Sequence, residues 1–280
     1  MKRDSITYTF AFAGTVCVVC AVLVSTAAVT MRERQRVNVE LDRRQNVLLA
    51  AGVLDQDESA SREVIQERFA SFEVVAIDLE AGQEVPDFNT TGYDPRRAAA
   101  SDDASRTAPP NQAGVRRLPK HALVYRKSDS DGRLQLLVLP VHGMGLWSTM
   151  YGFLALGPDL STIRGLTYYE HGETPGLGAE VDNPRWKQLW PGRVAFDEDG
   201  NPAIEVIRGR AGDVKNDPHR VDGISGATIT GRGVTWMLQF WLGEQGYGPY
   251  LERLRRDTPK GGGGNAGSGR GHSSGEVGHG

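Results

Sequence analysis

The sequence begins with a long apolar run, which a membrane anchor or a removable leader would account for. Residues 6–29 form a stretch of 24 residues without a charge, and a helix of that length measures about 36 Å, against a bilayer core of about 30 Å. A cleaved signal peptide is the alternative, because Lys2 and Arg3 precede the run and residues 25–27 are small. Since the run exceeds the ~7–15 residues of a usual signal core, we predict an uncleaved anchor over residues 1–31.

The charges beside the run leave its orientation open. Lys2 and Arg3 stand before it, and Arg32, Arg34 and Arg36 follow it. The positive-inside count slightly favours a cytoplasmic C-terminal domain. Long translocated domains follow this charge rule poorly, so the count alone does not fix the topology.

Cysteine usage and charge exclude several classes of function. Both cysteines, Cys17 and Cys20, lie in the apolar run, so the rest of the chain has no disulfide, no cysteine zinc site and no catalytic thiol. We expect the two to pack as small apolar side chains rather than bind a metal. The net charge of −3 lacks the basic excess that nucleic-acid binding requires. We therefore predict no metal site and no nucleic-acid partner.

The hydrophobic pattern after the run predicts an α+β fold, in which a single transmembrane helix precedes one domain over residues 32–258. Strand-like alternation and hairpin turns indicate a central antiparallel sheet, and helical spacing indicates flanking helices. The expected strands are 71–79, 123–125, 135–141 and 151–156, with a second hairpin around the turn 197–201. The expected helices are 32–52, 61–69, 186–190, 234–242 and 250–256.

Two segments are predicted to lie outside the domain core. Residues 87–119 are polar, small and proline-containing without a period, which predicts a disordered surface insertion with no function. Residues 259–280 hold 10 of the 35 glycines and predict a disordered tail.

One segment, residues 222–233, carries recognisable chemistry. It places glycines and hydroxyls directly before an apolar helix. Glycines let the backbone approach a bulky anion, and a helix start offers free N–H groups to a phosphate. The segment therefore reads either as a phosphate site or as a helix start after a glycine turn.

Three better-known motifs do not fit this segment. Gly226 and Gly231 have the spacing of a P-loop, but Arg232 stands where that motif requires Lys. A hydrolase nucleophile elbow requires glycine where Ala227 stands. A Ser, His, Asp triad using Ser225 would draw on residues too close in sequence to take triad geometry.

Ser225, Gly226, Ala227 and Thr228, preceded by Asp222 and Gly223, resemble the flavinylation motif of FMN-binding domains. In that motif the last threonine carries FMN through a phosphoester bond. Residues 143–152 and 167–178 resemble the C subunit of the sodium-translocating NADH:quinone reductase. Together with the single N-terminal span, the resemblance covers most of residues 1–258.

The resemblance implies a role for each matching residue. Thr228 would hold FMN covalently, with Ser225, Gly226 and Ala227 in the cofactor site and Thr230 as a second hydroxyl close by. Asp222 and Gly223 would be recognised by a separate flavin transferase. The other cofactor-binding candidates are Leu146, Trp147, Glu173, Thr174, Leu177 and Gly178.

Some of these candidates have a plain structural alternative. Trp147 and Leu177 would equally suit core packing, and Glu173 and Thr174 would equally suit turn capping. His171 is expected to be an ordinary polar residue and not a proton relay.

The implied function is electron relay by a covalent flavin, in a protein that has no catalytic residues of its own. Its expected partners are the other subunits of a membrane reductase, a flavin transferase and membrane lipid. The resemblance places the chain in the bacterial inner membrane with its domain outside the cytoplasm, against the arginine count. The alternatives are the FMN subunit of the related ferredoxin/NAD ion-translocating complex and a membrane-anchored FMN-binding sensor or assembly domain.

Overall fold

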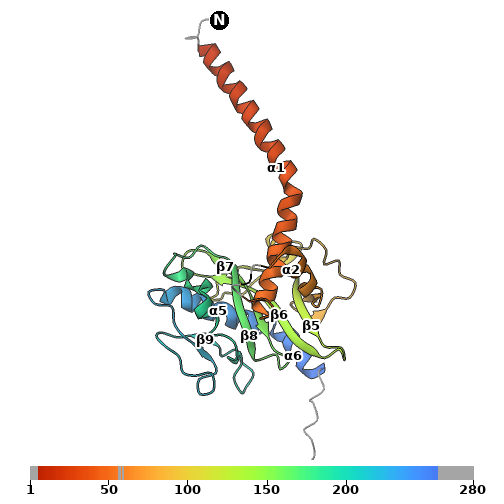
Figure 1. The fold of residues 1–280 in the computed structure, drawn as a ribbon, viewed down its shortest axis with the longest axis vertical. Coiled ribbons are helices and arrows are strands. Elements are labelled where there is room, and N and C mark those ends of the chain that lie inside the picture. Colours follow the sequence, from red (N-terminus) through yellow and green to blue (C-terminus); the bar gives the residue numbers. More distant parts are fainter. Residues whose placement is uncertain (1–5, 56–57, 59, 258–280) are drawn as a thin grey trace, which may run out of the picture.

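A computed structural model describes residues 6–55, 58 and 60–257. Helix α1 (Ile6–Ala50) is continuous over 45 residues and projects far out of the domain (Figure 1). Its segment Tyr8–Arg32 is long and apolar enough to cross a membrane, and none of that window is buried. Cys17 and Cys20 are exposed on it. The predicted single N-terminal apolar helix is confirmed; the predicted tail, residues 259–280, lies outside the described residues.

The base of α1 is part of the domain. Val47 and Leu48 have no exposed surface, so this end of the helix is held by burial of apolar side chains. The helix stops where Gly52 adopts a φ of +66°, a left-handed conformation that glycine accepts at a helix C-terminus. Helix α2 (Arg62–Phe69) follows, with the Ser61 side chain accepting a hydrogen bond from the backbone of Val64 at its start.

The centre of the domain is a six-stranded sheet with the order β2-β1-β5-β6-β7-β8. All neighbouring strands run antiparallel, as the sequence predicts. The strands are β1 (Glu73–Asp78), β2 (Gln83–Glu84), β5 (His121–Ser128), β6 (Leu134–Met144), β7 (Thr149–Leu156) and β8 (Ile163–Glu170). The sequence did not indicate β8.

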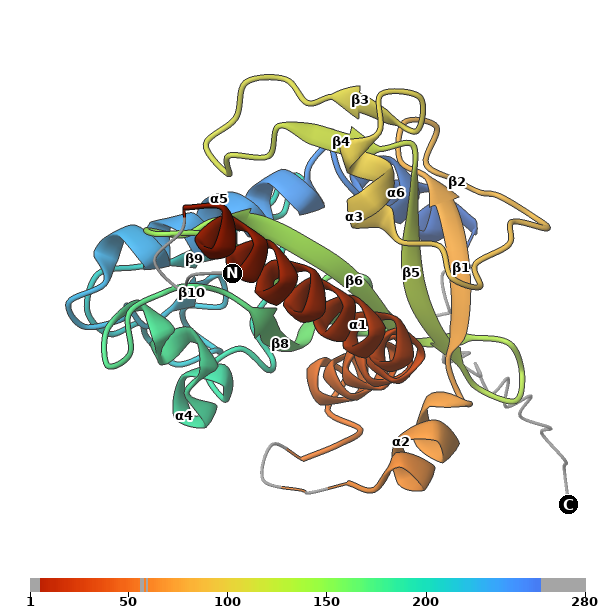
Figure 2. The same ribbon diagram turned by 90° about the horizontal axis from the view of Figure 1, so that it is seen from above.

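The two faces of the sheet carry different helices, because alternate residues of each strand point to opposite sides. Tyr125, Val138 and Phe153 pack with α1 and α2 in one apolar cluster. Val124 and Leu139 pack on the other face, where α5 (Thr228–Leu242) and α6 (Gly248–Asp257) lie. Figure 2 shows this arrangement from above, with strands β5 and β6 between the two pairs of helices. The predicted sheet flanked by helices is therefore confirmed.

The predicted disorder of residues 87–119 is wrong. The segment forms α3 (Pro95–Ala100) and the antiparallel pair β3 (Ser105–Thr107) and β4 (Arg117–Pro119). Asp94 caps α3, and Leu118 is completely buried. A hydrogen bond from the Met144 N–H to the Ala113 carbonyl ties the segment to the sheet. Its small polar residues are ordered by these long-range contacts, which leave no periodic pattern in the sequence.

The remaining elements are short and differ from the second predicted hairpin. One isolated bridge, Phe196 to Pro202, closes the turn, but β9 (Glu205–Val206) pairs in parallel with β10 (Arg220–Val221). The 3-10 helix η1 (Gly178–Asp182) and α4 (Pro184–Lys187) connect β8 to this region.

Candidate functional site

The motif around Thr228 forms a tight loop that leads directly into α5. Gly226 has a φ of +73°, which an L side chain rarely adopts. Ala227 occupies the N-cap position without a side-chain hydrogen bond to the helix. Thr228 is therefore the first helical residue, at a helix start whose N–H groups are not capped by a side chain and can face an anion.

Thr228 lines an open groove of about 690 Å³. Asp222, Gly223, Ser225 and Gly226 line the same groove, so the structure brings most of the predicted motif residues together. Three exposed arginines also line it: Arg208 and Arg210 from the loop after β9, and Arg232 from α5. Sequence reasoning missed Arg208 and Arg210, because no local pattern links the loop after β9 to the start of α5.

Asp222 and Gly223 hold the loop beside the groove. The Asp222 carboxylate accepts a hydrogen bond of 2.9 Å from the Ala211 N–H. The backbone carbonyl of Asp222 accepts one of 3.0 Å from the Trp186 indole. A side chain at Gly223 would collide with the Ile207 carbonyl, because an added Cβ would lie 2.3 Å from that oxygen. The contacts of Asp222 and the absence of a side chain at Gly223 therefore stabilise this turn.

Thr228 and Thr230 differ sharply in access. Thr228 is half-buried and lines the groove. Thr230 has no exposed surface, and its hydroxyl donates a hydrogen bond of 2.5 Å to the Glu173 carboxylate. Only the first of the two hydroxyls is reachable from outside.

The loops after β6 and β8 bring the other predicted site residues to the same end of α5. Glu173 accepts a hydrogen bond of 3.0 Å from the Trp147 N–H, and the Trp147 indole donates one of 3.1 Å to the Thr174 hydroxyl. Gly178 is buried against Glu173 and Thr230. These residues form one connected group, which we call the Glu173 cluster: Trp147, Glu173, Thr174, Gly178 and Thr230.

An exposed apolar wall stands beside this cluster. Trp147 is 66% exposed, Leu177 44% and Leu146 40%. A Cβ at Gly226 would lie 2.8 Å from the Leu177 side chain, so Leu177 rests against the motif loop. The core-packing alternative for Trp147 and Leu177 is therefore wrong, since both side chains are exposed at the surface.

His171 belongs to a separate polar chain. Its Nε2 lies 2.6 Å from the Asp182 carboxylate, which in turn lies 3.2 Å from the Lys187 ammonium. Its Nδ1 accepts a hydrogen bond from the Glu173 N–H. These polar contacts stabilise the turn over residues 171–173. Among the described residues, no group of three or more His, Cys, Asp and Glu side chains could hold a metal ion.

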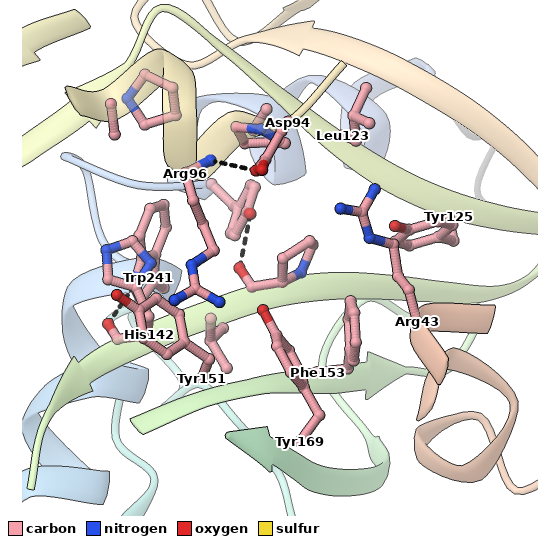
Figure 3. A pocket seen from close by; sticks show the side chains of 17 residues that line it. Arg43, Asp94, Arg96, Leu123, Tyr125, His142, Tyr151, Phe153, Tyr169 and Trp241 are labelled. Carbon is pink, nitrogen blue, oxygen red and sulfur yellow. Dashed lines mark hydrogen bonds between the residues drawn. The ribbon is translucent and has the colours of Figure 1, made fainter. Parts of the chain in front are cut away.

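A second cavity of about 130 Å³, the anchor pocket, lies between α1, α3 and the sheet (Figure 3). Arg43 of α1 and Arg96 of α3 stand over its aromatic walls. Arg96 lies 3.7 Å from the Tyr151 ring centre and pairs with Glu170. None of the residues that line the groove lines this pocket. Its walls are completed by Tyr125, His142, Phe153, Tyr169, Trp241 and Tyr247.

Comparison with known proteins finds consistent similarity. The family model described as "FMN-binding domain" matches residues 145–243, which include the Glu173 cluster and Thr228. The C subunit of the Na⁺-translocating NADH-quinone reductase from Yersinia pestis is 41% identical, with 93% of this chain and 97% of that protein covered. The equivalent protein from Pseudomonas aeruginosa is 40% identical, with 91% and 98% covered.

Two solved structures of related proteins have a similar fold. NqrC from Shewanella oneidensis superposes with a TM-score of 0.70 at 37% identity, covering 77% of this chain and 97% of that one. The C subunit of the same reductase from Parabacteroides distasonis gives 0.61 at 26% identity, covering 79% and 96%.

Proposed function

The chain belongs to the family formed by the C subunit of the Na⁺-translocating NADH-quinone reductase, and from that premise we propose that FMN is attached covalently to its Thr228. The chain is a single-pass membrane subunit of an oxidoreductase complex, with an FMN-binding domain. In the proposal, the Thr228 hydroxyl oxygen is joined to the FMN phosphate by a separate flavin transferase.

The difference between Thr228 and Thr230 carries the proposal. The two hydroxyls lie two residues apart on α5, so they point to nearly opposite sides of the helix. Thr228 opens on the groove, whereas Thr230 is buried and already hydrogen-bonded to Glu173. A transferase acting from outside the domain therefore meets one threonine.

The groove suits a phosphate group. The uncapped start of α5 supplies N–H groups and the positive end of the helix dipole. Arg208, Arg210 and Arg232 line the groove and supply positive charge. We propose that these groups hold the phosphate, and that Gly226 lets the backbone approach it closely.

The exposed wall suits the flavin ring. Leu146, Trp147 and Leu177 would cover one side of the isoalloxazine and exclude water from it, which tunes its potential. Bound FMN supplies electron transfer in and out of the domain. Because the wall opens at the surface, other members of the complex can approach the ring without passing through the core.

We propose that the anchor crosses the bacterial inner membrane, in contact with lipid, and that the domain lies on the periplasmic side. In support, the resemblance to the family implies that the flavin is attached outside the cytoplasm, whereas the arginines after the span favour a cytoplasmic domain. A phosphatase reporter fused after Arg256 should be active. An inactive reporter on a stable fusion would place the domain in the cytoplasm.

The attachment is tested on the full chain co-produced with a flavin transferase. We expect Thr228→Val to remove the covalent flavin completely, whereas Thr230→Val keeps it. Intact mass should show an increase of one FMN less water on the wild type, mapped to the peptide that contains Thr228. In-gel flavin fluorescence after denaturation reports the same loss. Flavin that survives Thr228→Val would refute the assignment.

A further inference from the structure

Glu173 is the most unusual charged group of the site. It is only 5% exposed, and no ion pair to it is found among the described residues. A buried carboxylate without a cation is costly unless hydrogen bonds replace the lost water. The buried Glu173 carboxylate therefore depends on hydrogen bonds from the protein.

The surrounding donors keep this carboxylate ionised. Burial alone would raise the pKa of Glu173, but hydrogen bonds from the Thr230 hydroxyl and from the N–H groups of residues 146–148 hold that pKa below its ordinary value. The hydrogen bond from the Thr230 hydroxyl measures 2.5 Å, and the one from the Trp147 N–H measures 3.0 Å. At neutral pH the group is an anion bound by a nest of N–H and O–H donors.

Two glycines shape the space for the carboxylate. A Cβ at Gly145 would lie 2.5 Å from one Glu173 oxygen, and a Cβ at Gly178 would lie 2.6 Å from the other. Real Cβ atoms essentially never come so close, so a side chain at either glycine would displace the carboxylate. The carboxylate therefore has a fitted cradle formed by two separate loops.

Three segments meet at this anion. Trp147 belongs to the loop between β6 and β7, Glu173 to the loop after β8, and Thr230 to the first turn of α5. The same segments carry the exposed wall and the attachment threonine. The carboxylate therefore links Trp147 to Thr230, two positions from Thr228 on α5.

We propose that Glu173 is a positioning residue for the flavin: its carboxylate fastens the three segments together and places a fixed negative charge beside the ring. This inference rests on the proposed function. A fixed anion opposes the negative charge that reduction adds to a flavin, so Glu173 should hold the flavin midpoint potential low. It does so without contact with the ring, because its oxygens are already taken by protein donors.

Two substitutions separate the two effects. Glu173→Gln keeps the size and removes the charge, whereas Glu173→Asp keeps the charge and shortens the reach by one methylene. The control is Glu198→Gln, which removes a charge from an exposed turn outside the site. All are made in the full chain, co-produced with a flavin transferase, and FMN on Thr228 is verified by peptide mapping.

We expect Glu173→Gln to shift the midpoint potential to a higher value, and Glu173→Asp and Glu198→Gln to leave it near that of the wild type. We expect Glu173→Asp to lower the flavin fluorescence anisotropy, because a shorter side chain cannot hold Trp147 and Thr230 together. If Glu173→Gln does not fold, the anisotropy of Glu173→Asp decides the positioning role.

The contrary outcomes are distinct. An unchanged potential in Glu173→Gln, or an equal shift in Glu198→Gln, overturns the electrostatic role, and unchanged anisotropy in Glu173→Asp overturns the positioning role. Both leave the attachment to Thr228 intact. A wild-type chain without FMN on Thr228 would instead overturn the proposed function, and this inference with it.

Discussion

Helix α5 joins two very different regions, the groove at its first residue and the anchor pocket near its end. Thr228 and Trp241 are 13 positions apart on this helix, about 20 Å at 1.5 Å per residue. Loops with close glycine contacts build the groove side, where Trp147 and Leu177 are exposed. Strand side chains build the anchor pocket, where Phe153 is 2% exposed. Loops give access to a cofactor, whereas strands give a rigid joint for the anchor helix.

The largest expected contrast comes from removing one aromatic side chain from each region. Phe153 packs between the rings of Tyr125 and Tyr169, so Phe153→Ala should lower the free energy of unfolding by about 3–5 kcal/mol. Trp147 is mostly exposed, so Trp147→Ala should cost only about 0.5 kcal/mol but change the flavin absorption spectrum.

Both variants are compared by thermal unfolding of the detergent-solubilised chain and by the flavin spectrum. The FMN that we propose on Thr228 should remain attached in each. Equal losses of stability would mean that the exposed wall is as much a part of the core as the pocket.

A second contrast lies in the response to acid. The ring of His142 lies between Tyr151 and Trp241, where burial and the positive charge of Arg96 lower the pKa of His142 to about 4. In the unfolded chain this group titrates near its ordinary pKa of 6.5, so between these values the unfolded state binds more protons. The stability that the neutral His142 ring contributes is fully present above pH 6.5. The free energy of unfolding should fall by up to about 3 kcal/mol as the pH approaches 4.

At the other end of α5, the lowered pKa of Glu173 predicts a loss of stability in a more acidic range. Its contribution is present above the ordinary pKa of 4.5 and is lost as the pH falls through the folded value.

Urea unfolding at pH 7 and pH 5 should show a smaller pH dependence of the unfolding free energy in His142→Gln than in the wild type. The same dependence in both would mean that His142 is not the group responsible.

The two regions also differ in how far the sequence predicts them. The motif loop is local: Gly226, Ala227 and Thr228 are consecutive, and a glycine turn before an apolar helix predicts either a phosphate site or a plain helix start. The membrane anchor and the main hairpins were equally visible, because their hydrophobic periods are long and regular.

The anchor pocket left no such signal. Arg43 and Arg96 are far apart in the sequence, and Arg96 lies in the segment that polarity alone marked as disordered. The order of that segment depends on burial of residues such as Leu118 in the core formed by distant strands. The same limit hid Arg208 and Arg210 in the groove and the anion nest around Glu173, since their partners come from other loops.

The smallest expected effect concerns the charge that closes the anchor pocket. Arg96 makes two hydrogen bonds to the Glu170 carboxylate, at 2.6 and 3.0 Å, and stacks on Tyr151. Both charged side chains are about half exposed, so water screens the pair and Arg96→Gln should cost only about 1 kcal/mol. The pocket is held by aromatic burial, and the arginine only covers it. Thermal unfolding of Arg96→Gln beside Phe153→Ala measures this ranking, and a loss equal to that of Phe153→Ala would show that the ion pair, not the aromatic wall, secures the base of the anchor.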